Sequence, residues 1–304
     1  SVESSSDGGL TWSVVGTPTT NSFVVTGLTN GTAYSYRVRA VNAVGTGAAS
    51  AVASATPSTV PAAPSSLTAT PSDSQVALSW TAPLVNGGST VTSYLVERST
   101  DGNSWTSLGV STTTTFNVAG LSNGTPYSFR VKAINASGTG AAGNIAVARP
   151  AGTPGAPSGL AATSGNRQIA LGWTAPTITN GSALTEYVVE SSATGGLTWR
   201  ALATVPSTQT TAVISGLTNG FAYVFRVYAR NSVGGGAASA WLTAAPVAPP
   251  IAPAEVTASS NVTATDASVT VNWTPPADDG GMSVVGYRVQ QSVDGGITWT
   301  STLQ

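Results

Sequence analysis

The stretch that decides the fold is AGLSNGTPYSFRVKAINASGTGAAG, residues 119–143. At its centre, in YSFRVKA (127–133), every second side chain is apolar, and the residues between them are polar. A period of two is typical of a β-strand that buries one face. The preceding Asn123-Gly124 pair is a turn signal, because both residue types tolerate a positive φ. The stretch therefore predicts a turn followed by a half-buried strand.

The same stretch occurs twice more, as TGLTNGTAYSYRVRAVNAVGTGAAS from Thr26 and SGLTNGFAYVFRVYARNSVGGGAAS from Ser215. Its equivalent tyrosines, Tyr34, Tyr127 and Tyr223, are 93 and 96 residues apart. A repeat of this length is too long for a solenoid unit and has the size of a small independent domain. The pattern predicts an all-β chain of tandem domains, arranged as beads on a string. The glycine-rich runs that close the three stretches are interpreted as conformationally permissive loops.

Proline-rich stretches divide the chain at residues 57–64, 150–157 and 246–253. Short linkers rich in proline favour extended and fairly stiff joints. We predict four repeats: the C-terminal half of a domain (1–57), two complete domains (58–150 and 151–246) and the N-terminal half of a domain (247–304). Half a sandwich leaves an apolar face open. We therefore expect the half-domains to be completed head-to-tail by adjacent copies or by a longer chain.

Each complete repeat shows about seven short strands with turn signals between them, which predicts a β-sandwich. Its motifs follow in the order Pro-x-x-Pro, a Trp in the second strand, Tyr-x-Val, Gly-Leu-x-Asn-Gly-x-x-Tyr and Arg-Val-x-Ala-x-Asn. Over nearly its whole length the chain resembles the immunoglobulin-like fibronectin type III domain, in the version found in tandem arrays of bacterial extracellular proteins. The resemblance implies a core Trp and a tyrosine corner, where a Tyr hydroxyl bonds back to the backbone. The implied core residues are Trp80, Trp173, Trp273, Tyr34, Tyr127, Tyr223, Leu28, Leu121 and Leu217.

Four predicted hairpins end in tryptophan: SSDGGLTW (5–12), STDGNSW (99–105), SATGGLTW (192–199) and SVDGGITW (292–299). The first and last match the spacing of the Asp box of sialidase-like propellers, in which Asp caps a tight turn and Trp packs beneath it. A well-capped hairpin is the structural interpretation. The functional alternative is a surface of aromatic rings that contacts sugars or a neighbouring chain. Its candidate residues are Trp12, Trp105, Trp199, Trp299, Trp241 and Tyr228.

Charged residues also repeat at fixed places in the predicted strands. Glu97 follows Tyr94, and Arg130 follows Tyr127, on strands that are neighbours in the resembling fold. We predict an exposed cross-strand ion pair between them, which contributes about 0.2–1 kcal/mol. The equivalent pairs are Glu190–Arg226 and Glu3–Arg37.

The composition excludes many kinds of site. The chain has no Cys and no His, so thiol nucleophiles, disulfides, iron–sulfur clusters and histidine metal sites or acid–base pairs are absent. Only 8% of residues are charged and the net charge is −1, which argues against a nucleic-acid partner. No apolar run is long enough for a membrane-spanning helix. The one adjacent acidic pair, Asp278-Asp279, is read as a solvated turn in preference to a calcium site.

With no catalytic, cofactor or metal site predicted, we expect a protein that is not an enzyme. The leading hypothesis is a structural array that forms a rod or filament outside a bacterial cell or on its surface. Its expected partners are further copies of itself or neighbouring repeats of a longer chain. One alternative is a spacer or carbohydrate-contacting module of a secreted polysaccharide-degrading enzyme, with polysaccharide as partner. The other alternative is a surface adhesin.

Overall fold

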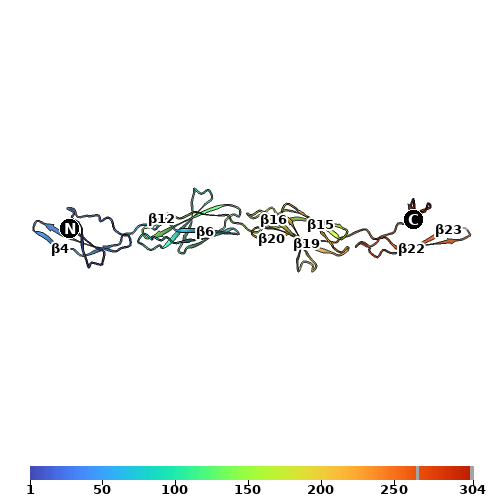
Figure 1. The fold of residues 1–304 in the computed structure, drawn as a ribbon, viewed down its shortest axis with the longest axis horizontal. Helices are drawn as coiled ribbons and strands as arrows, with labels where there is room; N and C mark the ends of the chain where they lie inside the picture. The colour runs from blue at the N-terminus through green and yellow to red at the C-terminus, as the bar shows by residue number, and fades with distance from the viewer. Residues whose placement is uncertain (265–266, 302–304) are drawn as a thin grey trace. The chain divides into compact units, whose positions relative to one another are not determined.

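The structure is a computed structural model that describes residues 1–264 and 267–301. In this part of the chain the regular elements are all strands (Figure 1), so the predicted all-β fold class is confirmed. The chain divides into two compact units, Ser1–Gly152 and Thr153–Gln304. The first unit contains the first and second repeats, and the second unit contains the third and fourth.

The second repeat is a sandwich of two antiparallel sheets. One sheet has the strand order β10-β7-β6, and the other has the order β12-β11-β8-β9, with β13 also paired to β11. The strands are β6 (Ser65–Ser72), β7 (Gln75–Thr81), β8 (Ser93–Ser99), β9 (Thr106–Ser111), β10 (Thr115–Ala119), β11 (Tyr127–Asn135), β12 (Gly138–Ala142) and β13 (Ala146–Ala148).

The third repeat has the same topology. Its sheets have the orders β14-β15-β18 and β17-β16-β19-β20, and β21 also pairs with β19. The strands are β14 (Ser158–Gly165), β15 (Gln168–Thr174), β16 (Leu184–Ser192), β17 (Arg200–Pro206), β18 (Thr211–Ser215), β19 (Tyr223–Asn231), β20 (Gly235–Ala238) and β21 (Leu242–Ala244). Two sheets that pack face to face make an immunoglobulin-like sandwich.

The core of each complete repeat follows from the period of two. In β11 every second side chain is buried, and Phe129 and Val131 are 0% and 1% exposed. From the opposite sheet, Trp80 meets Tyr94 edge to face, with ring centroids 5.4 Å apart. This T-shaped arrangement is one that aromatic pairs prefer.

The first repeat has one sheet, with strand order β2-β1-β3-β4 and β5 paired to β3. Its strands are β1 (Val2–Ser5), β2 (Ser13–Gly16), β3 (Tyr34–Asn42), β4 (Gly45–Ala49) and β5 (Ala53–Ala55). Val38 in β3 is 50% exposed, whereas its equivalent Val131 is buried, because the described chain places no second sheet over β3.

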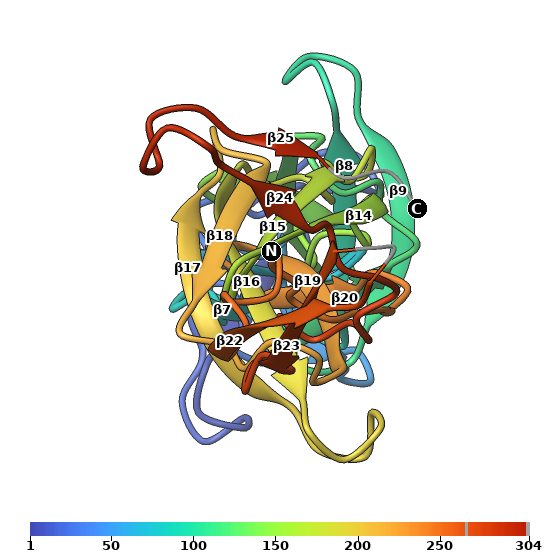
Figure 2. The same cartoon turned by 90° about the vertical axis from the view of Figure 1, so that its right-hand side faces the viewer.

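The fourth repeat contributes two strand pairs, which Figure 2 draws in orange to red. One pair is β22 (Ala254–Val262) with β23 (Ala267–Thr274), and the other is β24 (Gln290–Gln291) with β25 (Thr300–Ser301). Val269, which would face a sandwich core, is 64% exposed.

The first residues of the proline-rich segment that follows the first repeat are anchored to both of the repeats that the segment connects. The Gly31 N–H donates to the Pro57 carbonyl at 2.9 Å, and the Thr59 N–H donates to the Gly87 carbonyl at 2.8 Å. The turns of the two repeats also touch, because a Cβ added to Gly88 would lie 2.2 Å from the Gly31 nitrogen. Only one residue separates the two anchors, so the joint has little slack.

The same joint recurs between the third and fourth repeats. The Gly220 N–H donates to the Pro246 carbonyl at 2.9 Å, and the Ala248 N–H donates to the Gly280 carbonyl at 2.8 Å. A Cβ added to Gly281 would lie 2.3 Å from the Gly220 nitrogen. The two joints are therefore built from equivalent residues of the repeat.

The glycine-rich run of the second repeat was interpreted as a permissive loop, and this interpretation is wrong. Residues 138–142 form strand β12, which pairs with β11. A Cβ added to Gly140 would lie 2.1 Å from the Pro61 carbonyl oxygen. The glycine is needed because the proline-rich entry segment passes directly over this strand.

Candidate functional site

Each tryptophan hairpin is closed by a short polar side chain near its start. In the first hairpin, the Ser5 hydroxyl accepts the Gly9 N–H at 2.9 Å and donates to the Asp7 carboxylate at 2.7 Å. Asp7 in turn accepts the N–H groups of Leu10 at 3.0 Å and Thr11 at 2.9 Å. The side chains thus satisfy backbone donors that a tight turn would leave unpaired.

The second and third hairpins solve the same problem with different residues. Asp101 accepts the N–H groups of Asn103 at 2.8 Å and Ser104 at 2.7 Å. In the third hairpin Thr194 replaces Asp, and its hydroxyl accepts the Thr198 N–H at 2.9 Å. Threonine supplies the acceptor without a charge, so the third hairpin keeps its shape without a carboxylate.

Hydrogen bonds to the ionised carboxylates lower the pKa of the hairpin aspartates. The Ser5 hydroxyl makes the largest contribution for Asp7 and holds the pKa of that carboxyl well below its ordinary value. The Ser104 N–H makes the largest contribution for Asp101, whose pKa is lowered in the same direction. Donors that stabilise the charged form of an acid make it stronger. These carboxylates are therefore anionic turn caps and are poorly suited to donate a proton.

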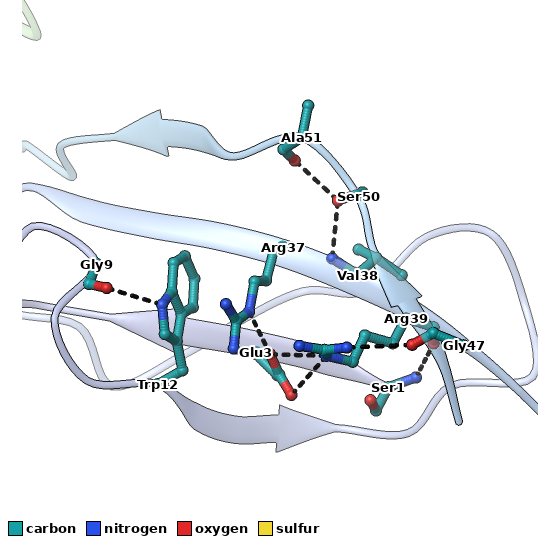
Figure 3. A network of polar contacts seen from close by, with 10 residues as sticks. All are labelled: Ser1, Glu3, Gly9, Trp12, Arg37, Val38, Arg39, Gly47, Ser50 and Ala51. Carbon is teal, nitrogen blue, oxygen red and sulfur yellow. Dashed lines mark hydrogen bonds and ion pairs between the residues drawn. The ribbon is translucent and has the colours of Figure 1, made fainter. Parts of the chain in front are cut away.

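The tryptophan of each hairpin in the first three repeats lies on an arginine. The Arg37 guanidinium is 4.1 Å from the centroid of the Trp12 ring. Its Nε also donates to the Glu3 carboxylate at 2.5 Å, so Arg37 lies between the ring and the acid (Figure 3). A cation over an aromatic face is attracted by the ring quadrupole. The equivalent sets in the next two repeats are Trp105–Arg130–Glu97 and Trp199–Arg226–Glu190.

The predicted ion pairs are confirmed, but they are less exposed than expected. Arg130 lies directly opposite Glu97, and the two join at 2.5 Å with side chains 25% and 11% exposed. The Arg130 guanidinium also lies 4.2 Å from the centroid of the Trp105 ring, which shields the arginine from solvent. Burial raises the pKa of the Glu97 carboxyl, but hydrogen bonds from Arg130 and Lys132 outweigh it, and the pKa is lowered overall.

The tyrosine corner is present in three repeats. The hydroxyls of Tyr34, Tyr127 and Tyr223 each accept a backbone N–H from five residues upstream at 3.1 Å. The donors are Thr29, Ser122 and Thr218. Each bond ties the start of a strand to the turn before it. In the first and third repeats this turn contains the glycine of the joint, Gly31 or Gly220, and the bond helps to hold it in place.

The other residues assigned to the core differ in burial from repeat to repeat. In the complete repeats Trp80, Trp173, Leu121 and Leu217 are buried. Leu28 and Trp273, which belong to the first and fourth repeats, are half-buried. The difference follows from the second sheet, which covers these positions only in the complete repeats.

The six residues proposed as a contact surface are not equivalent. Trp12, Trp105 and Trp199 are half-buried against their arginines, whereas Trp299 is 58% exposed. Trp241 is 57% exposed and lies beside Trp199, with ring centroids 5.8 Å apart. Of these five tryptophans, the described part of the chain thus brings two together, Trp199 and Trp241 in the third repeat.

Tyr228 is connected to the same pair of tryptophans through Arg226. Hollows on the surface near Tyr228 and near Trp241 share Arg226 in their linings. Arg230 donates to the Tyr228 hydroxyl at 3.3 Å and to Glu186 at 3.1 Å. The sequence reasoning named Trp241 and Tyr228 but missed Arg230 and Glu186. The missed signal is the two-residue spacing from Arg226 to Tyr228 to Arg230, which puts all three on one strand face.

The residues that the structure describes contain no group of three or more acidic side chains that could hold a metal ion. Asp278 and Asp279 cap their own turn, where they accept the N–H groups of Gly280 and Gly281 at 2.8 Å each. Among the described residues there is also no helix long and apolar enough to cross a membrane.

Comparison with known families gives one match to this chain. The profile of the Fibronectin type III domain matches residues 1–56, 62–149 and 155–245. These three ranges contain both complete sandwiches and the single sheet of the first repeat. A solved structure of chicken CNTN1 FN1-FN3 domains covers 73% of this chain and 78% of its own, with 20% identity and a TM-score of 0.40.

Curated relatives include proteins from bacteria and animals. Exoglucanase B of Cellulomonas fimi is 37% identical over 248 residues, which are 75% of this chain and 22% of that protein. Titin of Drosophila melanogaster is 27% identical over 240 residues, or 75% of this chain and 1% of titin. M-protein of Gallus gallus striated muscle is 30% identical over 72% of this chain and 16% of that protein. The chain therefore spans less than a quarter of the length of the curated relatives it matches.

Proposed function

This chain belongs to the fibronectin type III family, and from that premise we propose that it is a non-catalytic spacer array within a longer, secreted bacterial protein. The similarity to exoglucanase B supports this proposal, because it covers most of this chain but only 22% of that protein. A tandem array that makes up a minor part of a long polypeptide is suited to separate the other parts of that polypeptide. Among the described residues, the hairpin carboxylates that could have served as acids are occupied as turn caps.

The doubly anchored joint carries the proposal. A spacer keeps its length only if the segments between its domains resist bending. Between the first and second repeats, the linker is bonded to the upstream turn through Pro57 and to the downstream loop through Thr59. The contact of the Gly31 and Gly88 backbones leaves no room for a side chain in the joint. The joint between the third and fourth repeats has the same construction.

The joint is tested by measuring the distribution of distances across it. Because the chain has no native Cys, spin labels can be placed with Thr46→Cys and Thr112→Cys in the first and second repeats. Pulsed electron paramagnetic resonance of the full chain is expected to give one narrow distance distribution. The change Gly88→Ala places a Cβ 2.2 Å from the Gly31 nitrogen and should broaden or shift that distribution.

The matched control is Gly102→Ala. Gly102 also has a positive φ, +75° against +82° for Gly88, but a Cβ there would meet nothing within 4 Å. The backbone strain is therefore similar, and only the joint contact differs. A broad distribution in the unsubstituted chain would contradict the spacer proposal.

The filament of the leading hypothesis remains a prediction. The open apolar faces of the first and fourth repeats, where Val38 is 50% and Val269 is 64% exposed, favour completion by strands from another copy or a longer chain. Analytical ultracentrifugation over a range of concentrations tests the version between copies. Growth into larger species as concentration rises would support it, and a constant monomer mass would exclude it.

A further inference from the structure

Four residues that distinguish the third repeat from the second lie on one face of the third repeat. They are Trp241, Tyr228, Arg230 and Glu186. The equivalent residues of the second repeat, in the same order, are Ile145, Lys132, Ile134 and Ser93. The four residues of the third repeat come from three separate segments of the chain. Arg230 bonds to both Tyr228 and Glu186, and Trp241 lines a hollow together with Arg226, which also lines the hollow at Tyr228. Because the differences between the two repeats gather on one surface, we infer that this surface has a function that the second repeat lacks.

The surface follows the outer face of strand β19. Arg226, Tyr228 and Arg230 alternate with the buried residues of this strand, so they point away from the core. Steps of two residues along a strand cover about 6.8 Å, and the three side chains therefore span about 14 Å. Two adjoining hollows line this span and share Arg226 and Ala238. The span suits an extended chain better than a single small molecule.

Trp241 forms a fixed platform at one end of the span. Its ring lies directly over Gly196, where an added Cβ would be 1.7 Å from a ring carbon. Trp199 packs beside it, and Arg226 lies 4.1 Å from the centroid of the Trp199 ring. More than half of the Trp241 side chain remains exposed. A platform held in this way loses little conformational freedom when a ligand covers it.

We propose that the third repeat carries a binding site for a neutral polysaccharide chain, formed by Trp241, Trp199, Tyr228 and the ion pairs Glu190–Arg226 and Glu186–Arg230. A sugar ring presents an apolar face of C–H groups, which packs on an aromatic ring, and an edge of hydroxyls. Guanidinium and carboxylate groups offer paired donors and paired acceptors to such hydroxyls. This site goes beyond the proposed function, because a spacer needs no ligand.

The charge of the site favours a neutral ligand. Glu190 pairs with Arg226 at 2.6 Å, and Glu186 pairs with Arg230 at 3.1 Å, so two positive and two negative groups balance. An anionic or cationic polymer would gain attraction from one member of each pair and repulsion from the other. An apolar protein surface would remove water from both pairs without replacing its hydrogen bonds, which is costly. Hydroxyl groups can replace those hydrogen bonds.

The test is binding of neutral hexasaccharides to the full chain, followed by ligand-observed nuclear magnetic resonance. The probes are the β-linked hexamers of glucose, mannose, xylose and N-acetylglucosamine. At least one is expected to bind in a saturable way. Trp241→Ile and Tyr228→Lys introduce the residues of the second repeat and should each weaken that binding about tenfold, the effect of losing one stacked ring.

The matched control is Phe221→Thr, which removes an aromatic ring that is 51% exposed on the same repeat. The first two repeats have Thr32 and Thr125 at this position, and Phe221 packs on Tyr223, away from the proposed site. This variant should bind as the unsubstituted chain does. Circular dichroism of all three variants checks that the third repeat stays folded.

Three results would overturn the proposal. One is the absence of saturable binding to all four hexasaccharides. Another is equal weakening by Phe221→Thr and Trp241→Ile, which would make the binding non-specific. Tighter binding to a charged chain such as oligogalacturonate than to any neutral probe would also contradict the neutral-ligand argument. None of these results bears on the stiffness of the joints, so the spacer proposal is tested separately.

Discussion

The hydroxyl of Tyr187 is fully buried in the core of the third repeat and has no hydrogen-bond partner among the described residues. Burial raises the pKa of this phenol, since the charged form would lose its hydration. A buried polar group without a partner lowers stability. The Tyr187 ring still contributes, because it meets Trp173 edge to face at 5.5 Å.

We therefore expect Tyr187→Phe to leave the stability of the third repeat unchanged or to raise it by up to about 1 kcal/mol. Tyr223→Phe in the same repeat should lower stability by about 0.5–1.5 kcal/mol, because the Tyr223 hydroxyl accepts the Thr218 N–H. Amide hydrogen exchange of the third repeat measures both effects. A clear loss of stability in Tyr187→Phe would mean that the hydroxyl has a water partner.

The hairpin aspartates predict a local dependence on pH. Their pKa values are lowered by folding, so their contribution to stability is complete above the ordinary Asp pKa of about 4 and is lost as pH falls further. The amide protons of Thr11 and Ser104 should lose protection from hydrogen exchange in acid. The amide proton of Thr198 should keep its protection, because its acceptor Thr194 carries no charge. Asp7→Asn should remove most of the response in the first hairpin. Equal acid sensitivity of all three hairpins would refute this explanation.

The sequence predicted the charged pairs but not the tryptophan rings that lie against their arginines. The pairing of Glu97 with Arg130 could be predicted, because both alternate outward on neighbouring strands. The position of the Trp105 ring against Arg130 could not be predicted. The direction in which that ring points depends on the path of the hairpin backbone, which the spacing of residues in the sequence does not specify. For the same reason the grouping of Arg230 and Glu186 with Tyr228 became visible only in the structure.

At the level of the strand, periodicity was a sufficient guide to the fold. The alternation in residues 127–133 predicted β11 and its buried face, and the Asn-Gly turns predicted where such strands begin. Glycine content was misleading, because a glycine-rich run is equally compatible with a flexible loop and with a strand crowded by a neighbouring segment. Gly140 belongs to the second case, and only the position of Pro61 shows it.

This crowding predicts a difference between two otherwise matched glycines. Gly140→Ala should destabilise the second repeat by about 1–3 kcal/mol, because its Cβ would lie 2.1 Å from the Pro61 oxygen. Gly47→Ala, at the equivalent position of the first repeat, meets its nearest atom at 3.5 Å and should be close to neutral. Hydrogen exchange of β12 and β4 compares them. Similar effects at both positions would show that the entry segment does not press on the strand.

At the level of the whole molecule, the second and third repeats have separate cores. The core that contains Phe129 and Val131 and the core that contains Phe225 and Val227 share no residue. The tandem organisation was visible in the sequence, because a period of about 95 residues matches the size of a domain that buries its own core. The structure and the family match confirm the tandem sandwiches.

We expect the two complete repeats to unfold independently. Phe225→Ala removes a fully buried ring and should cost the third repeat about 3–5 kcal/mol. Exchange rates in the second repeat should not change, because its core contains none of the affected contacts. Site-resolved hydrogen exchange in the same sample reports both repeats, and loss of protection in both would show that they are coupled.

The anchored joint also determines how the chain would behave under tension. Between the bond at Pro57 and the bond at Thr59 there is one residue, which can extend by only about 3.5 Å. A pulling force across this joint finds no loose segment to straighten, so it reaches the strands of the two repeats that the joint connects almost at once. Two repeats joined in this way would then resist extension until one of them unfolds, and their combined length would increase in a single step.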